Sequence, residues 1–588
     1  MHKKKHTQTS TRWTSRKQVS PDPFVKRHSK VYEMEFLRIR FYFVLFFLLL
    51  MVGSLIARVV YLTIYDRAFL QKQGNARILR SVKIPAYRGM IVDRNGDPLA
   101  VSTPVDSVWV NPQDFPNTYA NVIHLQNLLH LSSQKIEHIV RSNAKRQFVY
   151  LRRNLSPQVA KQIQELAIPG VYLQHGFKRF YPQAEVSSQL VGFTNIDDQG
   201  QAGLEMAYNT WLEGALGAQR VVQDRYGHIV AVIAGIKAAK PGNDLTLSID
   251  NRIQFLAYSV LKTTVERVEA ESGSVVVLNP KTGEVLAMVN QPSFNPNNLP
   301  RHNYGQFRNR AVTDMFEPGS TMKAFSIANA LESGKYQPST LINTSPGWLM
   351  IGRNRVLDDN LNYGTISVTQ VLQKSSNVGV TKMTLSLPPA HFINLLRSVG
   401  FGERSQSGFP GESPGSLVDH RWRPFELATL AFGYGISVTP LQLAQAYAAI
   451  ANGGMKCPIT FLKRDEPVQC QQALRAKTAN EMLKMLETVV EIGGTGVRAR
   501  VTGYAIAGKT GTAYIAGKHG YDKENKKMIA SFVGIAPVSD PQLVVEVVVR
   551  EPKLKKYGGL VAAPAFSKIM DGALRIMNIP PSVAAGSH

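Results

Sequence analysis

The 588-residue chain is 44% hydrophobic and 19% charged, proportions that are typical of packed globular protein and exclude a disordered or collagen-like chain. Its formal net charge of +26 suits an anionic membrane or an acidic polymer, whereas nucleic-acid binding is disfavoured because Lys and Arg are spread along the chain without a recognisable binding motif. Two cysteines are too few for a disulfide scaffold or a cysteine-rich zinc site, and the thirteen histidines form no metal-binding pattern, so we expect no metal and no cofactor.

An apolar segment near the N-terminus predicts a membrane anchor. Residues 41–57 (FYFVLFFLLLMVGSLIA) contain seventeen residues without a charge, and apolar residues continue the segment to position 62. A bilayer span needs about 20 residues, and Arg58 can reach the outer interface from its place near the end of the span. A cleaved signal peptide is the alternative, but its apolar region is shorter and a small-residue cleavage site follows it. Here Arg58 and more apolar residues follow Ala57, which favours an uncleaved transmembrane helix.

The basic tail before this segment bears on its orientation. Residues 1–40 carry eleven Lys or Arg against three Asp or Glu, and their polar composition predicts a disordered tail. An excess of positive charge favours the cytoplasmic side of a membrane. Basic residues also follow the span, so the charge distribution alone leaves the orientation open; these residues are Arg58, Arg67, Lys72 and Arg77.

The next region, residues 63–235, predicts a mixed domain. One helix is expected to begin at Ser132-Ser133, and another at Ser156-Pro157, ending at Pro169-Gly170. The turn-rich stretch 239–243 (AKPGN) lies at the boundary with a further domain. The expected order is a basic tail (1–40), a membrane anchor (41–62), the mixed domain (63–235), a second domain (236–577) and a C-terminal tail (578–588).

The second domain has clearer strands. Residues 274–278 (SVVVL) and 284–289 (EVLAMV) flank NPKTG and predict a β-hairpin. Residues 531–536 and 543–549 (LVVEVVV) are rich in β-branched side chains, and the turn Ser539-Asp540-Pro541 separates them. Helical patterns lie between these two strand pairs, so the fold class we expect is α+β.

Two helix starts are predicted in the second domain. Thr439-Pro440 opens LQLAQAYAAIAN, which should end at Gly453-Gly454. Thr478 and Glu481 form a capping-box pattern before MLKMLETVV. Cys457 and Cys470 lie between these helices, and the sequence leaves open whether they form one disulfide or two buried thiols.

A candidate nucleophile lies in residues 317–325 (EPGSTMKAF). If a helix begins near Pro318, Ser320 and Lys323 share one face of it, and Ser320 lies where the helix N-terminus favours negative charge. A lysine can accept a proton from the serine only if its pKa is lowered by burial or by a neighbouring cation. Lys509 is the neighbouring cation that we nominate.

This motif is weak alone, and so are two others that follow it. The pattern S-x-x-K also occurs from Ser132 to Lys135, where a helix cap explains it. The combination is specific, because S-x-x-K, S-x-N and K-T-G occur in this order with 55 and then 134 residues between their first residues. The active-serine enzymes that recognise penicillin share this set. Its members here are Ser320 and Lys323, Ser375 and Asn377, and Lys509, Thr510, Gly511 and Thr512.

With these motifs the sequence resembles the class B penicillin-binding proteins over nearly all of the chain after the membrane span. Three further stretches resemble signatures of the family's non-catalytic domain, which serves as a pedestal and docking platform: residues 88–100 (RGMIVDRNGDPLA), 177–195 (FKRFYPQAEVSSQLVGFTN) and 203–205 (GLE). Within the class, the short tail, the single anchor, the modest pedestal and SSNVGV at 375–380 are similar to the division-specific transpeptidases. The resemblance implies a penicillin-binding serine transpeptidase fold behind the pedestal.

The resemblance also implies a reaction. Ser320 would attack the penultimate D-alanine carbonyl of a peptidoglycan stem pentapeptide, and a neighbouring strand's amino group would take the acyl group in a 4→3 cross-link. Lys323 would be the base, and Ser375 would relay a proton to the leaving amine. The backbone N–H groups of Ser320 and Thr512 would bind the oxyanion. Asn377 would hold the substrate amide, while Lys509, Thr510 and Thr512 would bind its carboxylate. Tyr514 replaces a residue that is often polar or basic in the family, which leaves the acceptor side of the groove open.

Four alternatives remain at this point: a membrane-anchored β-lactamase, a β-lactam sensor, a bifunctional wall synthase and the elongation-specific transpeptidase of the same class. A β-lactamase needs a water-activating base that the sequence does not place. A sensor would carry more membrane spans, and residues 63–235 leave little room for a glycosyltransferase domain. The partners that the resemblance implies are the stem and acceptor peptides, β-lactams, an FtsW-type glycosyltransferase and other division proteins, with the catalytic domain in the periplasm at the septum.

Overall fold

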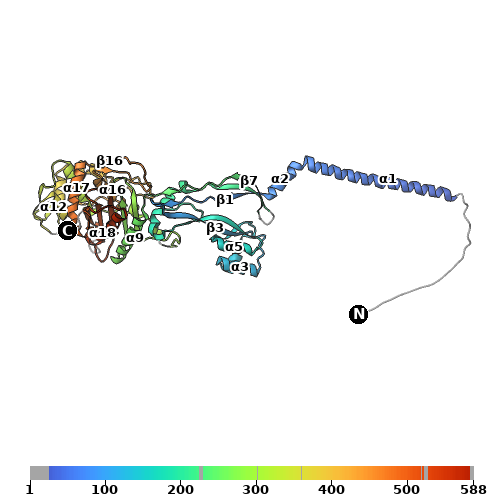
Figure 1. Ribbon diagram of the computed structural model, residues 1–588, viewed down its shortest axis with the longest axis horizontal. Helices are drawn as coiled ribbons and strands as arrows, with labels where there is room; N and C mark the ends of the chain where they lie inside the picture. The colour runs from blue at the N-terminus through green and yellow to red at the C-terminus, as the bar shows by residue number, and fades with distance from the viewer. Residues whose placement is uncertain are drawn as a thin grey trace, which may run out of the picture. The chain divides into compact units, whose positions relative to one another are not determined.

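The computed structural model describes residues 25–582 except 224–228, 301, 303, 359–360, 518–519 and 522–526. The chain divides into two compact units (Figure 1). The first comprises Met1–Val82 with Arg220–Ala234, and the second comprises Lys83–Gln219 with Gly235–His588.

The first unit contains the apolar N-terminal helix. Among the described residues, Leu37–Tyr65 is the one helical stretch that is long and apolar enough to cross a membrane, and none of it is buried. The predicted apolar segment is therefore helical, and it extends beyond 41–62 at both ends. The unit also contains most of a three-stranded sheet in the order β1-β6-β7. Its elements are α1 (Val25–Val60), a π-helical turn (Tyr61–Tyr65), α2 (Arg67–Ile78), β1 (Leu79–Ile84), β6 (Gly217–Gln223) and β7 (Ile229–Lys237).

The second unit begins with a sheet in the order β4-β3-β2-β8, in which β5 also pairs with β3. Helices α3, α4 and α5 pack around a core that includes Val108, Leu125 and Ile136. Ser132 and Ser156 cap α4 and α5, as predicted. The elements are β2 (Ile91–Val92), β3 (Pro98–Val110), α3 (Tyr119–Leu129), α4 (Ser133–Ser142), β4 (Val149–Leu155), α5 (Pro157–Glu165), β5 (Val171–Phe180), a 3₁₀ turn (Ala184–Ser187), α6 (Ser188–Val191), α7 (Gly203–Ala207), α8 (Asn209–Leu212) and β8 (Leu245–Thr246).

A buried ion cluster joins three distant parts of this domain. Glu205 is fully buried, and its two carboxylate oxygens accept hydrogen bonds of 2.6 Å from Nε of Arg88 and Nε of Arg179. Arg88 also donates to the backbone carbonyl of Glu205 at 2.8 Å. These three residues come from the three signature stretches quoted above, so the signatures meet in one charged contact inside the fold.

The rest of the second unit is built on a five-stranded antiparallel sheet in the order β10-β9-β21-β20-β17. Helices α9 and α18 pack on one face of this sheet, and α11 and α16 belong to the core on the other face. The predicted hairpin and strand pair are confirmed, and so is the α+β class. The strands are β9 (Ser272–Leu278), β10 (Val285–Gln291), β17 (Ala507–Tyr514), β20 (Met528–Ala536) and β21 (Leu543–Arg550).

Helices and short hairpins surround this sheet. The helices are α9 (Asn251–Arg267), α10 (Arg310–Thr313), α11 (Lys323–Glu332), α12 (Val368–Lys374), α13 (Asn377–Leu385), α14 (Pro389–Ser398), α15 (Pro424–Ala431), α16 (Pro440–Ala451), α17 (Ala476–Val490) and α18 (Gly558–Ile576), with 3₁₀ turns at Tyr304–Phe307, Gly319–Met322 and Val497–Ala499. The short strand pairs are β11 (Leu341–Asn343) with β14 (Thr365–Ser367), β12 (Trp348–Ile351) with β13 (Asn354–Leu357), β15 (Met455–Lys456) with β16 (Gln471–Gln472), and β18 (Ala516–Gly517) with β19 (Gly520–Tyr521).

One predicted helix start is confirmed and one is wrong. Thr439 caps α16 in a capping box with Gln442. The capping box predicted at Thr478 does not form, because α17 begins at Ala476 and Thr478 is buried in its first turn. The backbone N–H and guanidinium of Arg475 instead donate to Glu332 at 2.8 and 2.7 Å, so a carboxylate distant in sequence supports this helix start.

The two cysteines form a disulfide, Cys457–Cys470. The bridge closes the loop between β15 and β16, and Cys457 directly follows β15 while Cys470 directly precedes β16. The sequence had left this pairing open.

Glu546 on β21 is fully buried, and neither of its carboxylate oxygens has a hydrogen-bond partner among the described residues. Burial raises the pKa of this carboxyl well above its usual range. The folded state therefore holds a proton that the unfolded chain releases near pH 4.5. Above that pH, ionisation of the unfolded chain lowers the stability of the wild type by about 1.4 kcal/mol per pH unit while the folded group stays protonated.

We therefore expect the Glu546→Gln variant to gain thermal stability over the wild type as the pH rises from 5 to 8, with little difference near pH 4. Thermal midpoints of both proteins across this range check the prediction. If the thermal midpoints of the two proteins instead change in parallel across this pH range, the Glu546 carboxyl of the folded protein titrates like an exposed carboxyl.

Candidate active site

Ser320 lies in a 3₁₀ turn, Gly319–Met322, that leads directly into α11. The α-helix predicted to begin near Pro318 begins at Lys323 instead, and the 3₁₀ turn takes the place of its expected first turn. Ser320 and Lys323 still share a face, with Nζ of Lys323 3.1 Å from Oγ of Ser320. Lys323 is 1% exposed, whereas Ser320 is half-buried.

Ser375 links this turn to the S-x-N motif. It ends α12 in the left-handed conformation with φ 61°, and α13 begins two residues later. This backbone conformation is uncommon for a residue other than glycine and is often found at functional sites. Nζ of Lys323 donates to the Ser375 carbonyl at 2.5 Å and lies 2.9 Å from its hydroxyl.

Lys509 reaches the same hydroxyl from β17, the edge strand of the sheet. Its Nζ lies 3.1 Å from Oγ of Ser375, and the side chain is fully buried. Burial, and then the positive charge of Lys323, hold the pKa of Lys509 well below its usual range. Two amines thus converge on the hydroxyl of Ser375, beside the candidate nucleophile Ser320, and the positive charge of Lys323 contributes to the lowered pKa of Lys509. The converse effect, in which Lys509 lowers the pKa of Lys323, stays a prediction.

The rest of the K-T-G motif lines the edge of β17. Thr510 shares a hydrogen bond of 2.9 Å with Thr495, and the hydroxyl of Thr512 accepts from the backbone N–H of Gly558 at 3.1 Å. A Cβ at Gly511 would lie 2.2 Å from Oγ of Ser531 and 3.0 Å from the carbonyl oxygen of Pro318. Only glycine therefore allows this strand to approach the turn that carries Ser320.

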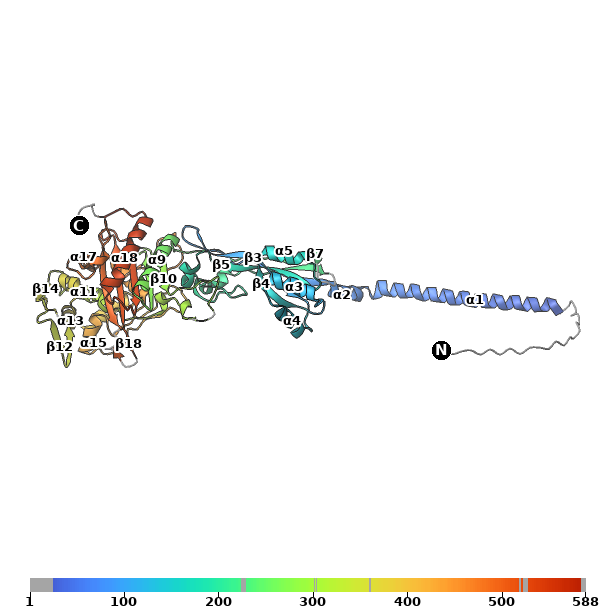
Figure 2. The ribbon, with the colours of Figure 1, turned by 90° about the horizontal axis from the view of Figure 1, so that it is seen from below.

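Asn377 belongs to the same region but has a different partner. Its amide donates to the carbonyl of Leu357 at 2.8 Å, and no hydrogen bond joins it to the two lysines in the part of the chain that the structure describes. The neighbouring Asp358 accepts hydrogen bonds from the Ser376 hydroxyl at 2.6 Å and the Val378 N–H at 2.9 Å. The β12–β13 hairpin, which Figure 2 shows next to α13, is thereby attached to the S-x-N motif.

Two contributors were missed from the sequence. Asp358 fixes the S-x-N turn and Thr495 holds Thr510, yet neither lies in a motif. The segment Gly493-Gly494-Thr495-Gly496 has a turn composition that could have indicated a close approach, whereas nothing local distinguishes Asp358.

The Gly511→Ala substitution tests the contact between β17 and the nucleophile turn. A methyl group there has to displace Ser531 or the backbone at Pro318, which moves Ser320 relative to Lys509. We expect acylation by a fluorescent penicillin to slow on the order of 10²-fold, the effect of a displacement of about 1 Å at a reacting group. Gly176→Ala is the matched control, because a Cβ there meets nothing within 4 Å. Acylation of Gly511→Ala at the wild-type rate would show that this approach does not position the serine.

Comparison with known proteins agrees with this geometry. The family model described as the penicillin binding protein transpeptidase domain matches residues 273–571, and the model of the penicillin-binding protein dimerisation domain matches residues 83–247.

The chain belongs to the class B penicillin-binding proteins.

Individual relatives match most of the length of this penicillin-binding protein. The chain is 43% identical to a probable peptidoglycan D,D-transpeptidase PbpC of Pseudomonas aeruginosa, over 89% of this chain and 93% of that one. It is 39% identical to the peptidoglycan D,D-transpeptidase FtsI of Escherichia coli K12, over 91% of each. A solved structure of the transpeptidase domain of penicillin-binding protein 3 from Burkholderia pseudomallei aligns with a TM-score of 0.53 and 40% identity, over 57% of this chain and 98% of that one.

Proposed function

We propose that this penicillin-binding protein is a peptidoglycan D,D-transpeptidase that cross-links stem peptides through an acyl-enzyme on Ser320, in septal wall synthesis during cell division. The observation that carries the proposal is the convergence of Lys323 and Lys509 on the hydroxyl of Ser375, with Ser320 3.1 Å from Lys323. The relatives named FtsI and PbpC carry the same activity in their names.

In acylation, Lys323 accepts the proton of Ser320 while Oγ attacks the carbonyl of the penultimate D-alanine. The backbone N–H groups of Ser320 and Thr512 stabilise the oxyanion, and removal of one such donor in serine enzymes lowers kcat about 10²–10³-fold. Ser375 lies between both amines and passes the proton to the nitrogen of the leaving D-alanine. The peptide bond to the terminal D-alanine breaks as the ester to Ser320 forms.

The substrate's terminal carboxylate is bound by Lys509, Thr510 and Thr512, while Asn377 holds its amide. An arriving carboxylate favours the charged form of Lys509, whose pKa is lowered in the free protein, so binding promotes its protonation. The acceptor amine then attacks the ester, releases Ser320 and completes the 4→3 cross-link. Tyr514, at the end of β17, is 40% exposed, and in this proposal it borders the acceptor side of the groove.

The helix Leu37–Tyr65 anchors the protein in the inner membrane, with the basic tail in the cytoplasm and the catalytic domain in the periplasm. The disulfide supports this orientation, because disulfides persist mainly outside the reducing cytoplasm. The partners that fit this placement are an FtsW-type glycosyltransferase and other division proteins. Contacts with them would involve the anchor and the pedestal.

The test is intact mass of the full-length protein in detergent over hours after one equivalent of a penicillin. We expect one adduct that persists, because a transpeptidase lacks a base that activates water against its ester. An adduct that clears within seconds would identify a β-lactamase, and no adduct on folded protein would contradict the assignment. Release of D-alanine from a stem pentapeptide separates a transpeptidase from a sensor.

A further inference from the structure

The chain on either side of Ser320 is held by residues that are distant in sequence. The N–H of Gly319 donates to the carbonyl of Gly433 at 3.2 Å. A Cβ at Gly433 would lie 2.1 Å from the Gly319 carbonyl oxygen, so the two segments approach as closely as glycine allows. After the nucleophile, the carbonyl of Thr321 accepts a hydrogen bond of 2.7 Å from the phenol of Tyr447 on α16. Ser320 therefore lies between two contacts with the stretch that follows α15.

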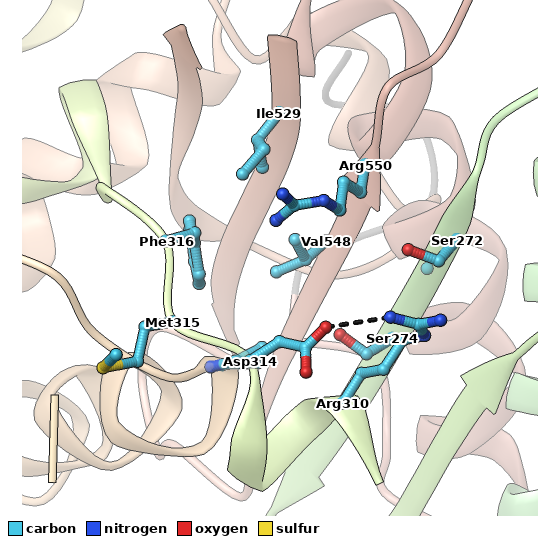
Figure 3. Close-up of a pocket in the computed structure, with 11 residues that line it drawn as sticks. Ser272, Ser274, Arg310, Asp314, Met315, Phe316, Ile529, Val548 and Arg550 are labelled. Carbon is cyan, nitrogen blue, oxygen red and sulfur yellow. Dashed lines mark hydrogen bonds and ion pairs between the residues drawn. The ribbon is translucent and has the colours of Figure 1, made fainter. Parts of the chain in front are cut away.

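The segment that enters this turn is also fixed. The ion pair of Asp314 with Arg310, at 3.0 Å, holds its beginning (Figure 3). Two residues later, Phe316 exchanges two backbone hydrogen bonds of 2.9 Å with Val438. The course of the chain is thus set before it reaches Ser320, and the contact with α16 follows on the other side.

The surroundings of Tyr447 make its phenol a fixed donor. The side chain is fully buried, and its ring packs edge-to-face against Phe325 of α11, with the ring centroids 5.3 Å apart and the planes at 88°. Burial raises the pKa of the phenol well above its usual range, so the phenol keeps its proton. Because the side chain is inaccessible, it cannot touch a substrate, and any effect on the reaction passes through Thr321.

We propose that Tyr447 is a positioning residue for the acylation of Ser320, an inference that rests on the acyl-enzyme proposed above. Ser320 has to present its hydroxyl to Lys323 and its backbone N–H to the oxyanion at the same time. A 3₁₀ turn has poorer internal hydrogen-bond geometry than an α-helix, so contacts from outside determine how its peptide groups are oriented. Without the phenol the peptide after Ser320 can rotate. A misplacement of about 1 Å at a reacting group costs about 10²-fold in rate.

The test compares Tyr447→Phe with the wild type as full-length protein in detergent. The rate of acylation by a fluorescent penicillin is followed at increasing concentrations, which separates the dissociation constant of the first complex from the acylation rate constant. We expect the rate constant to fall about tenfold or more, because the contact at Gly433 still limits the displacement. The dissociation constant should stay within about twofold of the wild type. Release of D-alanine from a stem pentapeptide should show the same division, a lower kcat with an unchanged KM.

Tyr504→Phe is the matched control. Tyr504 is 6% exposed, and its phenol donates to the carbonyl of Ile579 at 2.6 Å in the core that contains α9 and α18. Each variant loses one buried phenol that donates to a backbone carbonyl, so each thermal midpoint should fall by a few degrees. Both are assayed at a temperature at which they are folded, and only Tyr447→Phe should acylate slowly.

The fraction of protein that acylates separates positioning from stability. If Tyr447→Phe only lowers this fraction and the remainder acylates with the wild-type rate constant, the phenol merely stabilises the fold and the proposal is overturned. Equal slowing in Tyr504→Phe would overturn it as well. A wild type that forms no adduct would contradict the proposed function, and this inference with it, before any variant is compared.

Discussion

Replacing Ser320 with alanine is expected to abolish the penicillin adduct, because the attacking oxygen is removed while Lys323, Ser375 and Lys509 keep their places. In serine enzymes, loss of the nucleophile lowers kcat about 10⁶-fold, so no adduct should accumulate over hours. Intact mass after addition of one equivalent of penicillin measures the result. Because Ser320 is half-buried and its side chain is small, the variant should fold like the wild type.

The matched control is Ser132→Ala, which alters the other S-x-x-K sequence of the chain. Ser132 caps α4, with its hydroxyl accepting from the Lys135 N–H at 3.3 Å, so its loss costs about 1 kcal/mol of stability. Its acylation rate should equal that of the wild type. If Ser320→Ala still forms the adduct, proteolytic mapping of the modified residue would identify a different nucleophile and contradict the mechanism.

The second large effect that we expect is a loss of stability when Glu205 is replaced with alanine. The substitution leaves the buried guanidinium groups of Arg88 and Arg179 without their carboxylate. Removal of one partner from a buried ion pair costs about 3–5 kcal/mol. The thermal midpoint of the domain should fall by about 10 °C, measured by calorimetry on the full-length protein.

An exposed ion pair in the same domain provides the comparison. Asp197 is 63% exposed and pairs with Arg153 at 2.9 Å, and an exposed pair contributes about 0–1 kcal/mol. Asp197→Asn should therefore lower the midpoint by at most a few degrees. Equal small shifts in both variants would show that water reaches the Glu205 cluster and stabilises the two arginines.

The sequence predicted those parts of the fold that depend on local patterns. The hairpin of β9 and β10 follows from β-branched runs around a turn, and the start of α16 follows from Thr439-Pro440 with Gln442 three residues later. The motifs also identified the four side chains that meet at the site, Ser320, Lys323, Ser375 and Lys509.

Long-range contacts explain what the sequence missed. The start of α17 is displaced to Ala476 by the contact between Arg475 and Glu332, which are 143 residues apart. The role of Asp358 depends on its approach to Ser376 across a hairpin, and the pairing of the cysteines depends on the path between α16 and α17. The sequence around these residues gives no sign of such contacts, because charged residues like Arg475, Glu332 and Asp358 are equally common on surfaces exposed to solvent.

The position of β17 at the edge of its sheet has a consequence for selectivity. An edge strand has backbone N–H and C=O groups that no neighbouring strand uses, and an extended peptide can pair with them as an additional strand. A ligand held in this way is recognised by the course of its main chain, with little dependence on the side chains that point away from the sheet. Variation in a stem peptide at such outward positions should therefore be tolerated, whereas a change in backbone chirality next to the reacting carbonyl should not.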